Sequence, residues 1–149
     1  GAFFNPLQRG PADLFQPEFR ATRKSEIDDR LKEIAAPDRL RRRVLENLAH
    51  KRPIANHFVT WGIMDPALVE TTLARVPTSH LVAIFRRLLR DLKHNRSGFP
   101  DLIAFPGTGG YLLAEVKGPG DTLQDNQKRW LRFFVEEGIP AEVVNVEWT

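Results

Sequence analysis

Residues 97–117 read SGFPDLIAFPGTGGYLLAEVK, and this stretch decides the fold of the C-terminal part of the chain. Two short apolar runs flank the glycine-rich turn PGTGG at residues 106–110, a pattern typical of a β-hairpin. In an antiparallel hairpin the start of the first strand lies beside the end of the second. Asp101 is therefore predicted to lie close to Glu115 and Lys117.

Oxygen ligands gather at this predicted end of the hairpin. Side chains alternate along a strand, so Glu115 and Lys117 share one face, and Val116 offers only its backbone carbonyl to them. The carboxylates of Asp101 and Glu115, together with that carbonyl, form a ligand set suited to Mg²⁺ or Mn²⁺. The pattern leaves open whether one ion or two ions bind. A plain hairpin, with Glu115 and Lys117 as a surface ion pair, is the alternative.

Lys117 would supply the positive side chain of such a site. Its ammonium is placed to orient a water molecule or to offset charge on a phosphorus centre. Opposite charges favour the ionised form of a side chain, so a lysine beside two carboxylates is expected to stay charged. This favours charge stabilisation over proton abstraction as the role of Lys117.

The residues around this pattern resemble a known nuclease family. The sequence GFPDL at residues 98–102, followed by EVKGPGDTLQDNQ at residues 115–127, is similar to the VRR-NUC branch of the PD-(D/E)xK nuclease superfamily. Within that branch the chain most resembles the Fanconi-associated nuclease family of structure-specific DNA repair enzymes. The resemblance is strong over residues 88–148 and fainter over residues 1–15.

The resemblance implies an α/β fold with a PD-(D/E)xK, restriction-endonuclease-like core. That fold has a small mixed sheet, a C-terminal hairpin–helix–strand unit and a helical N-terminal half. Residues 1–149 would form one VRR-NUC nuclease domain, in which residues 25–94 are a helical insert and residues 97–149 are the catalytic unit.

The implied function is Mg²⁺- or Mn²⁺-dependent hydrolysis of flapped or branched DNA in repair. It includes 5′ flap endonuclease and 5′–3′ exonuclease activity in interstrand crosslink repair. Asp101, Glu115 and Lys117 would be catalytic, and Asp101, Glu115 and Val116 would hold the metal. The alternative is a non-catalytic nucleic-acid-binding or assembly module that retains the nuclease fold.

Two glutamines take a role from the resemblance alone. The run NPLQRGPADL at residues 5–14 is similar to a family stretch whose glutamine sits at the active site, and that residue is Gln8 here. Gln127 matches a glutamine that recurs after the Glu-x-Lys strand, and it is assigned to DNA binding. The alternatives are a loop glutamine on the surface for Gln8 and a half-buried glutamine bonded to backbone for Gln127.

An upstream partner segment is also implied. In the family, a long helix before the region of Gln8 contributes a further glutamate to the site. This chain has four residues before Asn5 and opens with the apolar sequence GAFF, without methionine. We therefore expect the active unit to include an upstream segment of the same polypeptide, without which the fold and the site are incomplete.

Composition bounds the class of protein and of partner. Apolar residues make up 42% of the chain and charged residues 28%, as in a globular domain of ordinary size. A formal charge of +3 with a pI near 9.6 favours a polyanionic partner such as DNA. No apolar run approaches the ~20 residues of a membrane helix, so no membrane partner is expected. The expected location is intracellular: the cytoplasm or nucleoid of a bacterium, or the nucleus of a eukaryote.

Apolar periodicity and start signals predict the remaining elements. Four helices are expected in the N-terminal half: residues 26–36 capped by Ser25, a second from Pro37, a third from Pro66, and a fourth over residues 78–93. Leu68 is predicted to be buried in the third, and residues 54–64 are left undecided. A helix capped by Asp121 or Thr122 is expected to reach residue 137, and residues 141–146 should form a parallel strand.

Basic residues form two groups. The first is interpreted as a solvated helix face and comprises Arg39, Arg41, Arg42, Arg43, Lys51 and Arg52. The second is interpreted as a DNA-phosphate contact because it leads directly into Asp101; its members are Arg86, Arg87, Arg90, Lys93, His94 and Arg96. Helical spacing predicts that residues 86, 87, 90, 93 and 94 share one face.

Overall fold

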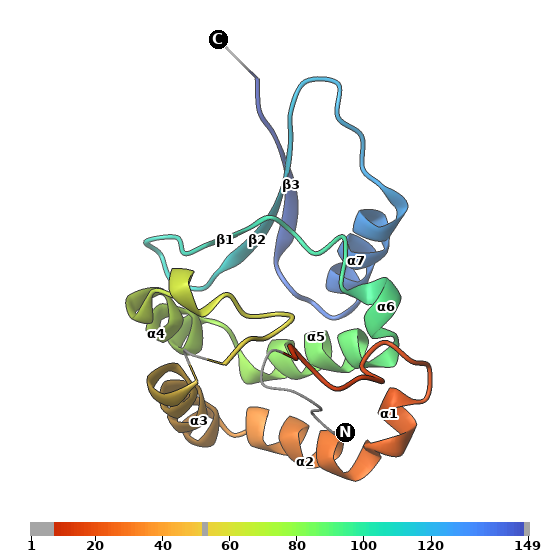
Figure 1. Cartoon of the computed structure of the whole chain (residues 1–149). Helices are drawn as coiled ribbons and strands as arrows, with labels where there is room; N and C mark the ends of the chain where they lie inside the picture. Colours follow the sequence, from red (N-terminus) through yellow and green to blue (C-terminus); the bar gives the residue numbers. More distant parts are fainter. Residues whose placement is uncertain (1–7, 52–53, 148–149) are drawn as a thin grey trace. The chain divides into compact units, whose positions relative to one another are not determined.

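The computed structural model describes residues 8–51 and 54–147 (Figure 1). The chain forms two compact units, residues 1–89 and residues 90–149. The first unit is helical and the second contains a small mixed sheet, so the predicted division into a helical N-terminal half and a C-terminal α/β unit is confirmed. Among the described residues, no helix is both long and apolar enough to cross a membrane.

Helices make up the regular structure of the first unit. Their bounds are α1 Phe19–Thr22, α2 Lys24–Ile34, α3 Pro37–His50, the 3₁₀ helix η1 Trp61–Ile63, α4 Pro66–Arg75 and α5 Thr78–Arg90. α3 and α4 each begin at a proline, as predicted, and the side chain of Asp65 accepts the Ala67 N–H at 2.9 Å to cap α4. The predicted cap at Ser25 is wrong. α1 ends just before α2 begins, so the chain is already helical shortly before Ser25, and Ser25 lies inside α2.

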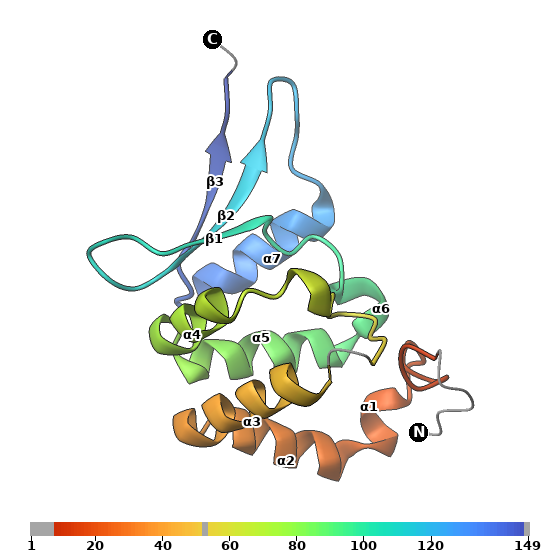
Figure 2. The same ribbon diagram turned by 60° about the vertical axis from the view of Figure 1, so that its left-hand side comes forward.

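Successive helices pack against one another in this unit. α1 contacts α2, α2 contacts α3, and α3 contacts α4; Figure 2 shows α2 and α3 side by side. Leu31, Leu48 and Val69 supply buried side chains. The predicted burial of Leu68 is wrong, because α4 turns Val69 inward and leaves Leu68 47% exposed. Residues 54–64, which the sequence left undecided, contain η1.

The fourth predicted helix is shorter than expected. α5 ends at Arg90, and a separate turn of helix, α6, spans Leu92–Asn95. Asp91 between them leaves the helical conformation, with φ −158° and ψ 88°, and its side chain accepts the His94 N–H at 3.1 Å. A short polar side chain that bonds nearby backbone competes with helix continuation. The prediction that residues 86, 87, 90, 93 and 94 share one helical face is therefore wrong.

The second unit is built around its central strand. β1 Leu102–Ala104 pairs antiparallel with β2 Leu112–Lys117, and β2 pairs in parallel with β3 Ala141–Asn145. The sheet order β1-β2-β3 is the hairpin followed by the parallel strand that the sequence predicted. α7, Asp125–Glu136, connects β2 to β3 and lies beside the sheet in Figures 1 and 2.

α7 begins later than predicted. Its N-cap is Gln124 rather than Asp121 or Thr122, and Gln124 forms a reciprocal capping box with Gln127. The carboxylate of Asp121 instead accepts the Gly118 N–H at 3.0 Å, which folds the loop that follows β2. α7 supplies the centre of the core, since Trp130 is 1% exposed and Phe134 is fully buried.

Candidate active site at the end of the hairpin

Asp101 lies beside β2, as the hairpin predicts. Its Oδ2 accepts the backbone N–H of Val116 at 3.1 Å. Regular pairing begins at Leu102, which lies opposite Ala114; one further residue in the same register places Asp101 opposite Glu115. Asp101 lies just before β1 begins. Its side chain accepts the Val116 N–H in place of a backbone carbonyl from a paired strand.

Val116 turns both of its backbone polar groups towards this edge. Backbone groups alternate between the two edges of a strand, and a residue's N–H and C=O share one edge. The carbonyl of the next residue, Lys117, faces β3, where it accepts the Val146 N–H at 2.8 Å. The Val116 carbonyl therefore faces the side where Asp101 bonds the Val116 N–H.

Glu115, Lys117 and Gln127 form one cluster of polar side chains at this strand end. Oε1 of Glu115 forms an ion pair with the Lys117 ammonium at 3.0 Å and accepts a hydrogen bond from the side-chain amide of Gln127. The carbonyl oxygen of that amide accepts a hydrogen bond from the Lys117 ammonium at 3.0 Å. The side chain of Glu115 is 2% exposed and that of Lys117 is 11% exposed. Glu115 is thus buried and Lys117 half-buried, so the alternative of a surface ion pair is wrong.

This donor set fits a hard divalent cation. Oδ1 of Asp101 and Oε2 of Glu115 accept no hydrogen bond from any described residue, so each carboxylate keeps an oxygen for a ligand. With the Val116 carbonyl they provide the oxygen ligands that Mg²⁺ and Mn²⁺ prefer. No cluster of three or more acidic, histidine or cysteine side chains occurs within residues 8–51 and 54–147. Water or substrate oxygens would therefore have to complete the coordination of an ion held here.

α7 also holds the chain segment that delivers Asp101. The indole N–H of Trp130 donates to the carbonyls of Asn95 and Ser97, both at 3.2 Å. Phe99 packs edge-on against Trp130, with ring centroids 5.0 Å apart. At Gly98 the backbone has φ +81° and passes so close to α7 that an added Cβ would lie 2.7 Å from the carbonyl carbon of Asn126. One helix therefore anchors both sides of the carboxylate site.

Two ionisable groups of this unit carry shifted pKa values. A hydrogen bond from the His94 ring holds the pKa of Asp91 below its usual range, and the backbone N–H of His94 adds to this effect. Burial raises the pKa of Tyr111 to about 12, which keeps that phenol neutral in the working pH range. Asp91 is therefore a fixed negative charge at the start of α6, in the segment that leads to Asp101.

Other predicted site residues lie elsewhere in the fold. Gln8 belongs to the first unit, where its amide donates to the Gly10 carbonyl at 2.6 Å, and its catalytic role stays a prediction. Arg86 and Arg90 are exposed on α5, whereas Arg87 is half-buried and its Nε is shielded from solvent. Lys93 and Arg96 are exposed in and after α6. Gln127 lies in the carboxylate cluster itself, although the sequence assigned it to DNA binding.

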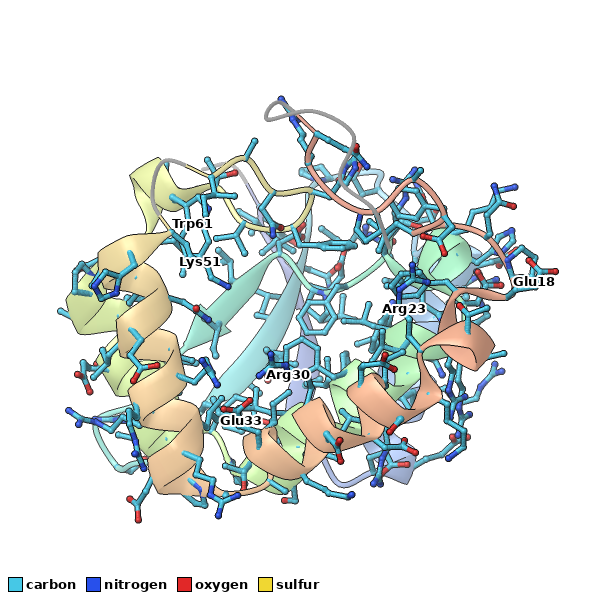
Figure 3. All side chains as sticks on the ribbon, turned by 60° about the horizontal axis from the view of Figure 1, so that its bottom comes forward. Glu18, Arg23, Arg30, Glu33, Lys51 and Trp61 are labelled. Carbon is cyan, nitrogen blue, oxygen red and sulfur yellow. The ribbon has the colours of Figure 1, made fainter. Side chains whose placement is uncertain are left out.

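Ion pairs within the first unit engage several of its other basic side chains. Arg41 donates twice to the carboxylate of Glu70, at 2.9 and 3.1 Å. Glu33 accepts Arg30 at 2.7 Å and Arg43 at 3.0 Å, and Figure 3 shows Arg30 and Glu33 next to one another on α2. These hydrogen bonds lower the pKa of Glu33, and the bond from Arg30 has the largest effect. Internal pairing of Arg41 and Arg43 supports the interpretation of the first basic group as a solvated helix face.

Comparison with known proteins gives a consistent set of relatives. Residues 35–148 match the VRR-NUC domain family. The Fanconi-associated nuclease 1 homolog of Pseudomonas aeruginosa is 42% identical over 99% of this chain, which spans 26% of that relative's length. Fanconi-associated nuclease 1 of Danio rerio is 28% identical over 99% of this chain, which spans 15% of its length.

A solved structure of a relative is also similar to this chain. The crystal structure of paFAN1 bound to DNA with a 1-nucleotide 5′ flap and a gap superposes with a TM-score of 0.91 at 40% identity. That match covers all of this chain and 27% of the other. The sequence resemblance to the Fanconi-associated nucleases and to their VRR-NUC domain is thereby confirmed.

Proposed function

We propose that this chain, which belongs to the VRR-NUC domain family, carries the catalytic site of a divalent-cation-dependent nuclease acting on flapped or branched DNA. Its sheet and α7 would be the PD-(D/E)xK core. The observation that carries the proposal is the end of the hairpin, where two carboxylates keep free oxygens beside the Val116 carbonyl. The 5′ flap DNA in the related crystal structure supports the choice of substrate.

Each residue of the hairpin end takes a role in this proposal. Asp101, Glu115 and the Val116 carbonyl would hold Mg²⁺ or Mn²⁺, with a DNA phosphate completing the ligand set. The bound ion would polarise the phosphodiester and lower the pKa of a coordinated water. Lys117 keeps at least one N–H beyond its ion pair with Glu115 and its hydrogen bond to Gln127, and it would offset charge on the phosphate.

We infer a repair function of the kind that the relatives' names indicate. The full natural protein would cleave 5′ flaps and digest DNA in the 5′–3′ direction during interstrand crosslink repair. The competing class is a non-catalytic binding module. DNA binding alone would not require free carboxylate oxygens beside a half-buried lysine. The two classes differ in one outcome, because the module binds flap DNA without cleaving it.

Cleavage by the full natural protein tests the proposal. We expect turnover of 5′ flap DNA with Mg²⁺ or Mn²⁺, slower turnover of plain duplex, and none after chelation by EDTA. A matched reaction with Ca²⁺ checks whether binding alone survives, because Ca²⁺ often replaces Mg²⁺ as an oxygen-ligand ion without the same geometry. Cleavage that continues at full rate in EDTA would contradict the proposed chemistry.

Exposed arginines of α5 provide a separate prediction about DNA affinity. Changing Arg86 or Arg90 to alanine is expected to weaken binding of all DNA sequences alike and to lower the slope of log K against log salt by about one. Arg41→Ala is the matched control, because Glu70 already engages that guanidinium. Fluorescence anisotropy at several salt concentrations measures the DNA affinity and its salt slope in each variant. A loss confined to one DNA sequence would count against phosphate contact.

A further inference from the structure

Gln127 occupies an unusual position between opposite charges. Its amide N–H donates to Oε1 of Glu115, and its amide oxygen accepts the Lys117 ammonium at 3.0 Å. A carboxylate can only accept and an ammonium can only donate, so the two charges fix which end of the amide faces which partner. No ionised side chain could serve both partners as this neutral amide does.

The same amide is tied to the start of α7. Its oxygen also accepts the Gln124 N–H at 2.9 Å, and the Gln124 side chain accepts the Gln127 N–H in return. The backbone at Asn126 and Gln127 is in close contact with Gly98, so the chain segment before β1 also fixes the start of α7. Gln127 therefore projects from a fixed point.

These contacts determine what remains available for chemistry. The hydrogen bond from Gln127 and the ion pair with Lys117 both involve Oε1 of Glu115, and Oε2 is left without a described partner. Lys117 donates one hydrogen bond, to Gln127, and pairs with Glu115, so at least one of its three ammonium N–H groups is left. Without the amide, the Glu115 carboxylate could rotate and Lys117 could draw both oxygens into its own ion pair.

We propose that Gln127 is a positioning residue, which reserves Oε2 of Glu115 and one N–H of Lys117 for the reaction. This inference rests on the proposed function of the hairpin site. It replaces DNA contact, the role that the sequence suggested, with control of the two residues that Gln127 touches. Partners that orient a metal ligand commonly contribute tenfold to a hundredfold in metal affinity or activity.

Two substitutions in the full natural protein separate positioning from a purely structural role. Gln127→Met removes both the donor and the acceptor. Gln127→Glu keeps an acceptor for Lys117 and for the Gln124 N–H but loses the donor to Glu115. We expect kcat on 5′ flap DNA to fall about tenfold to a hundredfold in both, with KM changed less than about twofold. Gln127→Met loses the bonds at the start of α7, and Gln127→Glu brings a second carboxylate against the buried Glu115, so both should lower the melting temperature.

Binding of Mn²⁺ gives a readout that does not depend on turnover. Isothermal titration should show weaker Mn²⁺ binding in both variants, by about tenfold or more. Glu136→Met is the matched control, because Glu136 is exposed at the end of the same helix. It should match the wild type in kcat, Mn²⁺ affinity and melting temperature.

The outcomes distinguish this inference from the proposed function. Wild-type kcat and Mn²⁺ affinity in both Gln127 variants, with Asp101→Ala inactive, would overturn the inference alone. A kcat that is lost in Gln127→Met but kept in Gln127→Glu, which retains the acceptor for the Gln124 N–H, would reduce Gln127 to a helix-start residue and also overturn the inference. Full activity of Asp101→Ala would overturn the proposed function and this inference with it.

Discussion

Replacing Asp101 with alanine or Glu115 with glutamine is expected to lower turnover of 5′ flap DNA by at least about a thousandfold. This is the scale seen when a group that acts directly on the reacting atoms is lost. Each change removes one of the two carboxylates that keep a free oxygen at the end of the hairpin. DNA affinity should change little, because we propose that Arg86, Arg90 and other basic groups supply it.

The two positions differ in their expected effect on folding. Asp101 is exposed and bonds one backbone N–H, so its loss should cost about 1 kcal/mol. Glu115→Ala would leave the half-buried Lys117 without its carboxylate, a change that costs about 3–5 kcal/mol, and glutamine is the safer test. Asp125→Ala, at an exposed position, is the control. Single-turnover rates and circular dichroism measure activity and folding; near wild-type turnover in either variant would remove the nuclease site from this hairpin.

Gly98→Ala is expected to cause the largest loss of stability from a single added methyl group. The new Cβ would lie 2.7 Å from the Asn126 carbonyl carbon and 2.8 Å from the Gln127 nitrogen, and neither backbone atom can move easily. Strain from φ +81° adds about 1–2 kcal/mol to an overpacking cost of about 1–3 kcal/mol. The free energy of unfolding should fall by about 2–5 kcal/mol, and cleavage should fall too because Gly98 leads to Asp101.

Gly120→Ala separates the two contributions. Gly120 has φ +83°, nearly the same as Gly98, but nothing lies within 4 Å of an added Cβ. Only the conformational strain should remain, at about 1–2 kcal/mol. Urea denaturation of both variants gives the comparison. Equal losses at the two glycines would show that the close approach to α7 contributes nothing.

The hairpin and its parallel strand could be predicted from sequence because their signals are local. A glycine-rich turn between two apolar runs fixes the pairing of β1 with β2, and this register brings Asp101 to Glu115. The helix between β2 and β3 then implies the parallel crossover. The contact of Asp101 with the Val116 N–H follows from the same geometry.

Competition between side chains and backbone accounts for the boundary errors. Asp91 lies within an apolar periodicity that continues to Leu92, so only its bond to the His94 N–H reveals the break after α5. Asp121 and Thr122 are good capping residues by type, yet the reciprocal bonds of Gln124 and Gln127 set the start of α7. Periodicity identified these helices but could not decide between nearby capping residues.

The support that α7 gives to the site could not be predicted because it is tertiary. Gly98 has no local signal for a close approach to Asn126, which lies far along the chain. The bond of Trp130 to the carbonyls of Asn95 and Ser97 joins segments that only the fold brings together. The pattern Gln-x-x-Gln at residues 124–127 was the one visible signal for the placement of Gln127.

Mn²⁺ binding to the full natural protein on an uncleavable 5′ flap DNA shows whether the end of the hairpin holds the metal. Electron paramagnetic resonance counts the bound ions in the wild type and in the double variant Asp101→Asn, Glu115→Gln. We expect the wild type to bind at least one Mn²⁺ and the double variant to lose that ion, with flap DNA still bound. Equal Mn²⁺ binding by the two proteins would place the metal away from this hairpin and rule out a metal site formed by Asp101 and Glu115.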